Sequence, residues 1–336
     1  MVIARSFQSH DLLFLMIIQT PFRPTQAQLH VPPTLGQGVS CLLVIVTFLT
    51  ITRPAPAQYL GPFDFGQDPI EYDARESYGS NEWQFGELRL PEGEGPFPVV
   101  VLLHGGCWQG LHRPQNVQPL AAAITEMGWA TWNLGHRQSV DEGGGWTGTF
   151  KDVGAGVDYL RELSKRFSID TTRVVTMGHS AGGHLALWAG ARHGIESSDS
   201  LYSSNPLRVA GAVSLGGIPN LNANYHQDPN PCGDGVTDIM GGTPDDLPSR
   251  YESASPAERL PLGTPQLFLH GVDDYVVPFA QIEAYSSAAR EAGDEVYAHI
   301  FQQASHFEMI APASEIWQNE VSLAMKGFLD KLLQTK

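Results

Sequence analysis

A serine between two glycines is the feature of the chain with the clearest chemical meaning. The sequence GHSAG at residues 178–182 fits the pattern Gly-x-Ser-x-Gly, with an apolar strand-like run before it and helically spaced apolar residues after it. On such a sharp turn the serine hydroxyl is exposed, its backbone is strained, and N–H groups at the start of the helix favour negative charge. A five-residue pattern also occurs by chance, but the flanking strand and helix are the context that it requires. We therefore expect Ser180 to be a nucleophile.

A second motif follows the apolar run FPVVVLL at residues 97–103. It reads HGGCW at residues 104–108. Two glycines after a buried strand allow backbone N–H groups to turn toward a bound oxygen, although a plain Gly-Gly turn is the alternative. The predicted oxyanion hole consists of the backbone N–H groups of Gly105, Gly106, Cys107 and Ala181.

Two further motifs offer a base and an acid. His306, in SHFE at residues 305–308, is the candidate general base, and the alternative for any one histidine is a structural role. The loop HGVDDYVVP at residues 270–278 offers Asp273 and Asp274, either of which can orient that histidine unless it is only a solvated loop carboxylate. The order serine, acid, histidine is the one that an α/β-hydrolase sheet gives to its catalytic triad.

The elements that must position these residues alternate between strand and helix signals from Tyr72 onward. The expected strands are 82–90, 97–103, 129–134, 174–177, 209–215, 265–269 and 296–301, and the expected helices are 116–127, 152–167, 279–292 and 314–333. This alternation predicts an α/β fold, a mainly parallel central sheet with helices on both faces, in one domain over residues 58–336. Residues 216–250 are rich in Gly, Pro, Asn and Asp, and we expect them to form a short irregular insertion over the site.

The first 57 residues differ in composition from the remainder. An apolar run at residues 41–51 followed by Ala55-Pro56-Ala57 fits a secretory signal with its cleavage site, and predicts a periplasmic or secreted protein. The absence of Lys and Arg between Arg23 and Arg53 weakens that signal, so a start codon called too far upstream and a cytoplasmic protein are the alternatives. Neither this run nor an earlier apolar run at residues 12–18 reaches the roughly 18 residues that span a bilayer, so no stable membrane span is expected.

Composition excludes some partners. The chain has 336 residues, of which 42% are hydrophobic and 17% charged, as in a globular protein with a sizeable core. Its net charge of −16 argues against a nucleic-acid partner, because phosphates would be repelled. The sequence contains no His-x-x-x-His or Cys-x-x-Cys cluster, so we expect no metal and no cofactor.

Two cysteines remain when the N-terminal segment is removed. Cys107 lies in the predicted oxyanion turn and Cys232 in the predicted insertion. An even number of cysteines in a compartment that permits disulfides makes the pair a candidate for a bridge, which would hold the insertion over the site. Two unrelated free thiols are the alternative.

Taken together, these motifs resemble the α/β-hydrolase superfamily from about Glu82 to the C-terminus. The branch is that of esterase-like proteins with an HGGxW motif, which includes kynurenine-formamidase-like and hormone-sensitive-lipase-like bacterial enzymes. In the pattern HG-x-x-D-x-x-V-P of these proteins the triad acid is the fifth residue, so the resemblance implies Asp274 rather than Asp273. Lipase-like members often have a third glycine where this chain has Cys107, which implies a narrower acyl side of the site.

The implied activity is that of a serine hydrolase. Ser180, His306 and Asp274 would cleave a small-molecule carboxylic ester, or second an aryl formamide, through an acyl-enzyme. A serine peptidase or acylaminoacyl-type hydrolase is a further alternative, although the chain is too short for the propeller domain of dipeptidyl-peptidase-like enzymes. A non-catalytic binding protein on the same fold is the rival from a different class, and the intact triad argues against it.

Overall fold

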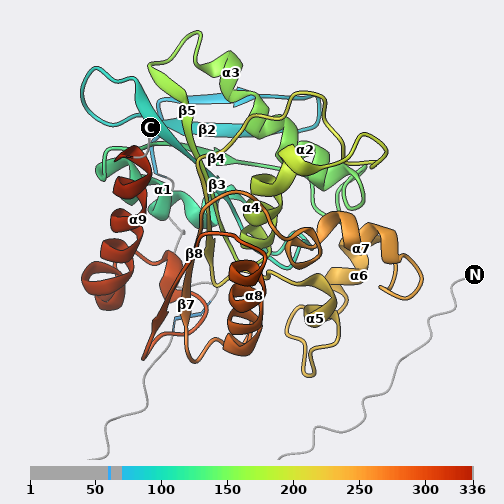
Figure 1. Ribbon diagram of the computed structural model, residues 1–336. Helices are drawn as coiled ribbons and strands as arrows, with labels where there is room; N and C mark the ends of the chain where they lie inside the picture. The colour runs from blue at the N-terminus through green and yellow to red at the C-terminus, as the bar shows by residue number, and fades with distance from the viewer. Residues whose placement is uncertain (1–59, 62–69, 335–336) are drawn as a thin grey trace, which may run out of the picture. The chain divides into compact units, whose positions relative to one another are not determined.

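The computed structural model describes residues 60–61 and 70–334 (Figure 1). The expectations for residues 1–57 therefore lie outside the described residues. Within the described part, no helix is long and apolar enough to cross a membrane.

One eight-stranded sheet organises the fold, in the strand order β1-β2-β4-β3-β5-β6-β7-β8 (Figure 1). The strands are β1 Ala74–Ser77, β2 Phe85–Arg89, β3 Phe97–Leu103, β4 Ala130–Leu134, β5 Ile169–His179, β6 Gly211–Leu215, β7 Gln266–Gly271 and β8 Val296–Phe301. β2 pairs antiparallel with β1 and with β4, and the neighbouring pairs from β4 across to β8 are all parallel. The predicted α/β fold with a mainly parallel sheet is confirmed.

Helices cover both faces of this sheet. They are α1 Gln118–Glu126, α2 Gly148–Asp158, α3 Leu160–Leu163, α4 Ala181–Ala191, α5 Leu221–Tyr225, α6 Gly235–Met240, α7 Pro248–Ala254, α8 Phe279–Glu291 and α9 Ser322–Gln334. Successive residues of a strand point to opposite faces, so Val99 and Val101 of β3 join an apolar cluster with α2, α4 and α8. Val100 and Leu102 join a second cluster with α1 and α9. Burial on both faces explains why β3 is apolar without alternation.

Some elements differ from the sequence expectation. The edge strand β1 was not expected, because its sequence ARES has no apolar run and alternates between half-buried and exposed residues. The expected helix 152–167 begins earlier, at Gly148, and is divided into α2 and α3. Its first turn is weak by helix propensity, but Phe150 is fully buried against Trp146 and Trp188. Tertiary packing therefore decides where this helix begins.

The insertion is more ordered than expected. Residues 216–250 were expected to be irregular, but they contain α5, α6 and the start of α7. The side chain of Asn220 caps α5 by accepting a hydrogen bond from the N–H of Ala223 at 2.9 Å. These helices have five to seven residues each, too few for a helical period to appear in the sequence.

Two histidines buried in this fold make it sensitive to acid. Burial lowers the pKa of His136 and of His184 from 6.5 to about 4. Below about pH 6.5 the unfolded chain binds protons at these positions and the folded chain does not, so the free energy of unfolding falls until about pH 4. Each histidine should lower the free energy of unfolding by about 2 kcal/mol between pH 7 and pH 5.

Denaturant unfolding at the two pH values measures this loss. His184→Gln should reduce this loss of stability by about 2 kcal/mol, because the unfolded chain then has no histidine at position 184 to take up a proton. His226→Gln is the matched control, because it makes the same substitution at a histidine that is exposed rather than buried. An equal pH dependence in wild type and His184→Gln would contradict the assignment.

Candidate active site

The predicted nucleophile lies on a strained turn between β5 and α4. Ser180 has φ 56° and ψ −123°, a conformation that non-glycine residues rarely adopt. The two glycines of the motif are required by packing. A Cβ on Gly178 would collide with the carbonyl oxygen of Gly182, and a Cβ on Gly182 would collide with that of Leu103.

The acid and the base meet at the ends of β7 and β8. His306 Nδ1 lies 2.8 Å from Asp274 Oδ2, and both residues are buried. An ionised carboxylate only accepts hydrogen bonds, so Nδ1 carries the proton and Nε2 is left as the base. Asp273, the competing aspartate, is exposed, and its backbone N–H donates to the carbonyl oxygen of Ala304. The structure therefore brings Asp274 to the histidine and leaves Asp273 at the surface.

The carboxyl of Asp274 is held ionised by its surroundings. Burial alone would raise its pKa, but the charge of His306 and the hydrogen bond from it hold the pKa below the usual value, with help from His270. The other oxygen, Oδ1, accepts hydrogen bonds of 2.8 Å from the N–H groups of Val276 and Val277. These two donors set the orientation of the carboxylate toward the histidine.

Ser180 and His306 line the same pocket, which has a volume of about 180 Å³. The other lining residues are Gly106, Cys107, Leu111, His112, His179, Pro231, Tyr275, Val276 and Phe307. Among the described residues, no hydrogen bond joins Ser180 to His306. Such bonds are often long in enzymes without substrate and shorten when substrate binds.

The predicted oxyanion turn packs directly against the nucleophile. A Cβ on Gly105 would lie 3.1 Å from the Cβ of Ser180, and one on Gly106 would lie 2.6 Å from the backbone nitrogen of His112. Gly106, Cys107 and Trp108 have φ of 107°, 52° and 59°. These positive values turn the backbone sharply at the end of β3, beside the first N–H groups of α4, as a hole for a developing oxyanion requires.

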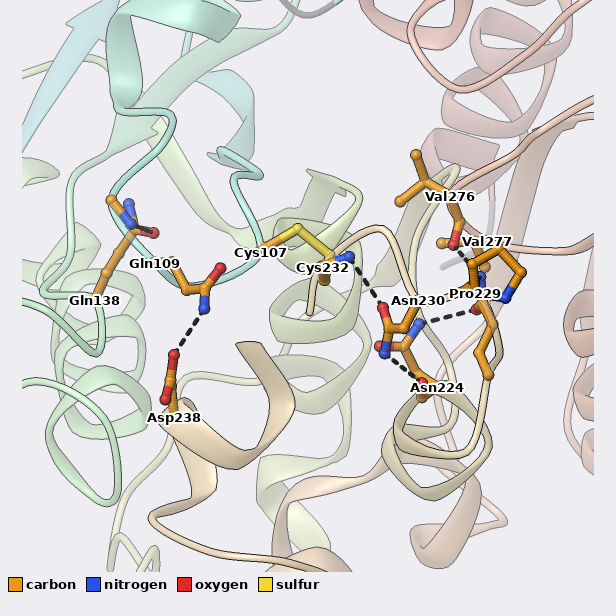
Figure 2. The surroundings of a disulfide bond; sticks show 12 residues. Cys107, Gln109, Gln138, Asn224, Pro229, Asn230, Cys232, Asp238, Val276 and Val277 are labelled. Carbon is orange, nitrogen blue, oxygen red and sulfur yellow. Dashed lines mark hydrogen bonds between the residues drawn. A yellow bond between two sulfur atoms is a disulfide. The ribbon is translucent and has the colours of Figure 1, made fainter. Parts of the chain in front are cut away.

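Cys107 and Cys232 are joined by a disulfide, with their Cα atoms 5.3 Å apart (Figure 2). This Cα separation lies within the range that a disulfide can span. The sequence left this pairing open, and the structure brings the two cysteines together across 125 residues.

Removal of this bridge should destabilise the fold. In the chain-entropy model a closed loop of this length contributes about 4–5 kcal/mol, less any native strain. The double substitution Cys107→Ser with Cys232→Ser should lower the free energy of unfolding by an amount approaching that figure, measured by denaturant unfolding. Peptide mapping of unreduced protein should recover the two cysteine peptides linked, and alkylation of both thiols without reduction would contradict the bridge.

Several residues of the site were not singled out from the sequence. Gly216, at the end of β6, has φ 54°, and a Cβ there would lie 3.2 Å from both Asp274 Oδ2 and His306 Nδ1. Glu308 Oε2 accepts a hydrogen bond of 2.9 Å from the N–H of Ser305, which holds the loop that carries His306. A glycine directly after an expected strand and a carboxylate two residues after the histidine were the available signals.

The histidines near the motifs have different roles. His179 and His270 are buried beside the candidate base and acid. His179 Nε2 lies 3.0 Å from the carbonyl oxygen of His306, and His270 Nε2 lies 3.7 Å from Asp274 Oδ2. His112 lines the pocket. It reaches the pocket because the turn after HGGCW folds back onto Gly106, which sequence spacing does not reveal.

The BD-FAE family model matches residues 87–288, which is more than half of the chain. The chain belongs to the BD-FAE family. The match covers β3, the serine turn and the loop of Asp274, and it ends before β8 and His306. The predicted esterase-like branch of the α/β hydrolases is confirmed by this match and by the relatives below.

The curated relatives are mostly esterases. Esterase LipQ of Mycobacterium tuberculosis is 29% identical over 199 residues, which cover 58% of this chain and 46% of LipQ. Esterase LipC of the same organism is 24% identical over 205 residues, covering 58% of this chain and 49% of LipC. The acylamino-acid-releasing enzyme of Arabidopsis thaliana is 25% identical over 289 residues, covering 71% of this chain and 35% of that enzyme. The chain spans about half the length, or less, of these relatives.

Solved structures with the same fold include a truncated carbohydrate esterase from gut microbiota. It has a TM-score of 0.67 at 20% identity, and the match covers 79% of this chain and 98% of that chain. Esterase Est2 of Thermogutta terrifontis, with propionate bound, has a TM-score of 0.61 at 19% identity, with 78% and 93% covered. At these identities the likeness shows the α/β-hydrolase fold alone.

Proposed function

We propose that this protein hydrolyses carboxylic esters of small molecules through Ser180, His306 and Asp274, with an acyl-enzyme intermediate. The observation that carries the proposal is the 2.8 Å hydrogen bond between His306 Nδ1 and Asp274 Oδ2, in a pocket that the histidine shares with Ser180. The strained backbone at Ser180 supports it, because such strain accompanies nucleophiles on strand-to-helix turns.

The reaction then follows from the chemistry of these groups. His306 Nε2 takes the proton of the Ser180 hydroxyl as its oxygen attacks the carbonyl carbon. Asp274 holds the histidine tautomer and stabilises the imidazolium that forms. The N–H groups of Ala181 and of the turn at Gly105, Gly106 and Cys107 hold the oxyanion. Each such donor contributes about 2.7–4 kcal/mol. His306 protonates the leaving alcohol. In the second half of the reaction His306 takes a proton from water, which attacks the acyl carbon, and then returns a proton to the Ser180 oxygen as the acid is released.

We propose esters rather than other acyl compounds as substrates because the relatives LipQ and LipC are esterases. An aryl formamide would use the same steps, with His306 protonating the leaving amine. The similarity to an acylamino-acid-releasing enzyme makes an acylated amino acid a second candidate. A pocket of about 180 Å³ lies below the roughly 300–1,000 Å³ of sites for drug-sized ligands, which favours a short acyl group.

A panel of substrates tests the proposal. Purified protein should hydrolyse a short-chain aryl ester faster than an aryl formamide or a peptide anilide of similar size. A serine-reactive phosphonate should abolish turnover, because the Ser180 oxygen displaces its leaving group, and the peptide that contains Ser180 should gain the mass of the phosphonyl group. No turnover of any substrate together with no labelling of Ser180 would make the protein a non-catalytic binder on this fold.

We further propose that the protein is exported and cleaved after Ala57. The support is the apolar run at residues 41–51 followed by Ala-Pro-Ala, and the disulfide, since disulfides persist in oxidising compartments. N-terminal sequencing of protein recovered outside the cytoplasm should find Gln58 first. Recovery of the chain with Met1 intact in the cytoplasmic fraction would contradict export.

A further inference from the structure

A short segment crosses from one wall of the active-site pocket to the other. We call residues 227–232 the strap. At one end Cys232 is bonded to Cys107 of the oxyanion turn, and at the other Gln227 Nε2 donates a hydrogen bond of 3.0 Å to the carbonyl oxygen of Val276. In Figure 2 the chain passes from Cys232 through Asn230 and Pro229 toward Val276. The strap therefore links the two loops that flank the serine.

The strap also forms part of the pocket. Pro231 lines it together with Ser180 and His306. Val276, which receives the hydrogen bond from Gln227, donates its own N–H to Asp274 Oδ1 at 2.8 Å. One end of the strap thus adjoins the oxyanion donors, the other adjoins the triad acid, and its middle borders the space that a substrate must occupy.

Polar contacts hold the strap in one shape. Asn230 Oδ1 accepts a hydrogen bond of 2.9 Å from the N–H of Cys232, and Asn230 Nδ2 donates one of 2.8 Å to the carbonyl oxygen of Asn224 in α5. Gln281 Nε2 of α8 donates to Gln227 Oε1 at 3.1 Å. These anchors are hydrogen bonds, whereas the anchor at Cys107 is covalent and is therefore the one that limits movement of the strap over the serine.

The covalent anchor acts on the oxyanion turn as well. Cys107 and Trp108 both have positive φ, a conformation that non-glycine residues keep only when their surroundings impose it. The carbonyl oxygen of Cys107 is further crowded by α6, because a Cβ on Gly235 would lie 2.6 Å from it. Loss of the bridge would remove one of the restraints on the backbone of this turn.

We propose that the Cys107–Cys232 bridge and its strap are a positioning element that aims the oxyanion donors and limits the size of the substrate. The inference rests on the proposed ester hydrolysis. It assigns Cys232 and Pro231 different effects: Cys232 acts on both the donors and the size limit, and Pro231, which borders the pocket, acts on the size limit.

The test uses two series of aryl and alkyl esters, one lengthened in the acyl group from acetyl to octanoyl and one lengthened in the alcohol. For Cys232→Ser, kcat on the acetyl ester should fall by about tenfold, less than the 10²–10³ that removal of a donor costs. In at least one series, the preference in kcat/KM for the shortest member should fall by about tenfold. Pro231→Ala should relax the same preference, because it removes ring atoms from the wall of the pocket.

Gln109→Ala is the matched control. Its Nε2 donates to Asp238 Oδ2 at 2.7 Å, so it also ties the oxyanion turn to the insertion, but without touching the strap. Both kcat and size preference should stay within about twofold of wild type. Thermal unfolding shows whether each variant is folded, and titration with the phosphonate counts its reactive active sites. If Cys232→Ser does not fold, Pro231→Ala tests the size limit instead. The effect of the bridge on kcat is then measured on wild-type protein treated with a dithiol. The dithiol reduces the Cys107–Cys232 disulfide to two thiols and is itself oxidised to a disulfide.

The outcomes separate this inference from the proposed function. Wild type that hydrolyses the esters, with Cys232→Ser and Pro231→Ala unchanged in both series, overturns the positioning role and leaves ester hydrolysis intact. A uniform loss of rate in Cys232→Ser, with no change of size preference in either variant, shows a structural role only and also overturns it. Wild type with neither turnover nor labelling of Ser180 overturns the proposed function itself.

Discussion

Replacing Ser180 with alanine should lower kcat for the ester by about 10³–10⁶ while the protein stays folded. The serine supplies the attacking oxygen, and without it His306 and Asp274 have no nucleophile to activate, since members of a triad act as a unit. The residual rate would come from the oxyanion donors and from binding alone. Steady-state kinetics on the short-chain aryl ester measure the loss, and thermal unfolding measures the fold.

Ser305→Ala is a matched control for loss of a buried hydroxyl next to the site. Ser305 precedes His306 and is fully buried, and its hydroxyl has no hydrogen-bond partner among the described residues. The backbone N–H of Ser305, which holds Glu308, is kept by this substitution. Its kcat should stay close to wild type. Near-full activity in Ser180→Ala, or an equal loss in Ser305→Ala, would show that Ser180 is not the nucleophile.

Replacing Asp274 with asparagine should lower kcat by about 10³–10⁴, and replacing Asp273 with asparagine should change it little. The amide of an asparagine at 274 can donate a hydrogen bond to His306 Nδ1, which favours the tautomer with its proton on Nε2 and removes the base. The two substitutions make the same change in charge at neighbouring positions, so Asp273→Asn controls for the lost negative charge. Equal losses, or a larger loss from Asp273→Asn, would mean that the exposed aspartate is the acid.

The free energy of unfolding, measured by denaturant unfolding as a function of pH, sharpens this comparison. Because the pKa of the Asp274 carboxyl is held below its usual value, the carboxylate stays ionised well into acid solution. Its contribution to stability is therefore present above the pKa of an unfolded aspartate and is lost only as the pH falls through the lowered value. Asp274→Asn should remove that contribution, and Asp273→Asn should not.

Much of the site could be predicted from the sequence because its parts are local. The turn at Ser180 is specified by neighbouring residues, because only glycine at positions 178 and 182 allows the close approach of β5 and α4. The parallel sheet follows from apolar strands separated by helices, and this topology brings the ends of β3, β5, β7 and β8 to one edge. Short apolar segments of this kind are specified by their own composition.

Contacts between distant segments could not be predicted in this way. β1 forms because β2 offers an edge to pair with, and its own sequence carries no signal. The short helices of the insertion depend on caps and on packing against the body of the fold. The pocket wall formed by His112 and Pro231 depends on how two loops fold back toward the serine.

The fold class, the serine turn and the order of the candidate triad could all be predicted from the amino-acid sequence, because each motif consists of residues that adjoin in the chain. The tertiary structure showed that Asp274 rather than Asp273 reaches His306, as the resemblance implied. It also showed that Cys107 meets Cys232, and that Gly216 must lack a side chain beside both Asp274 and His306. The groups joined in this way lie 32 to 125 positions apart in the chain, at distances of a few ångströms. Such distances are set by how the strands pack together, and no local pattern of residues encodes them.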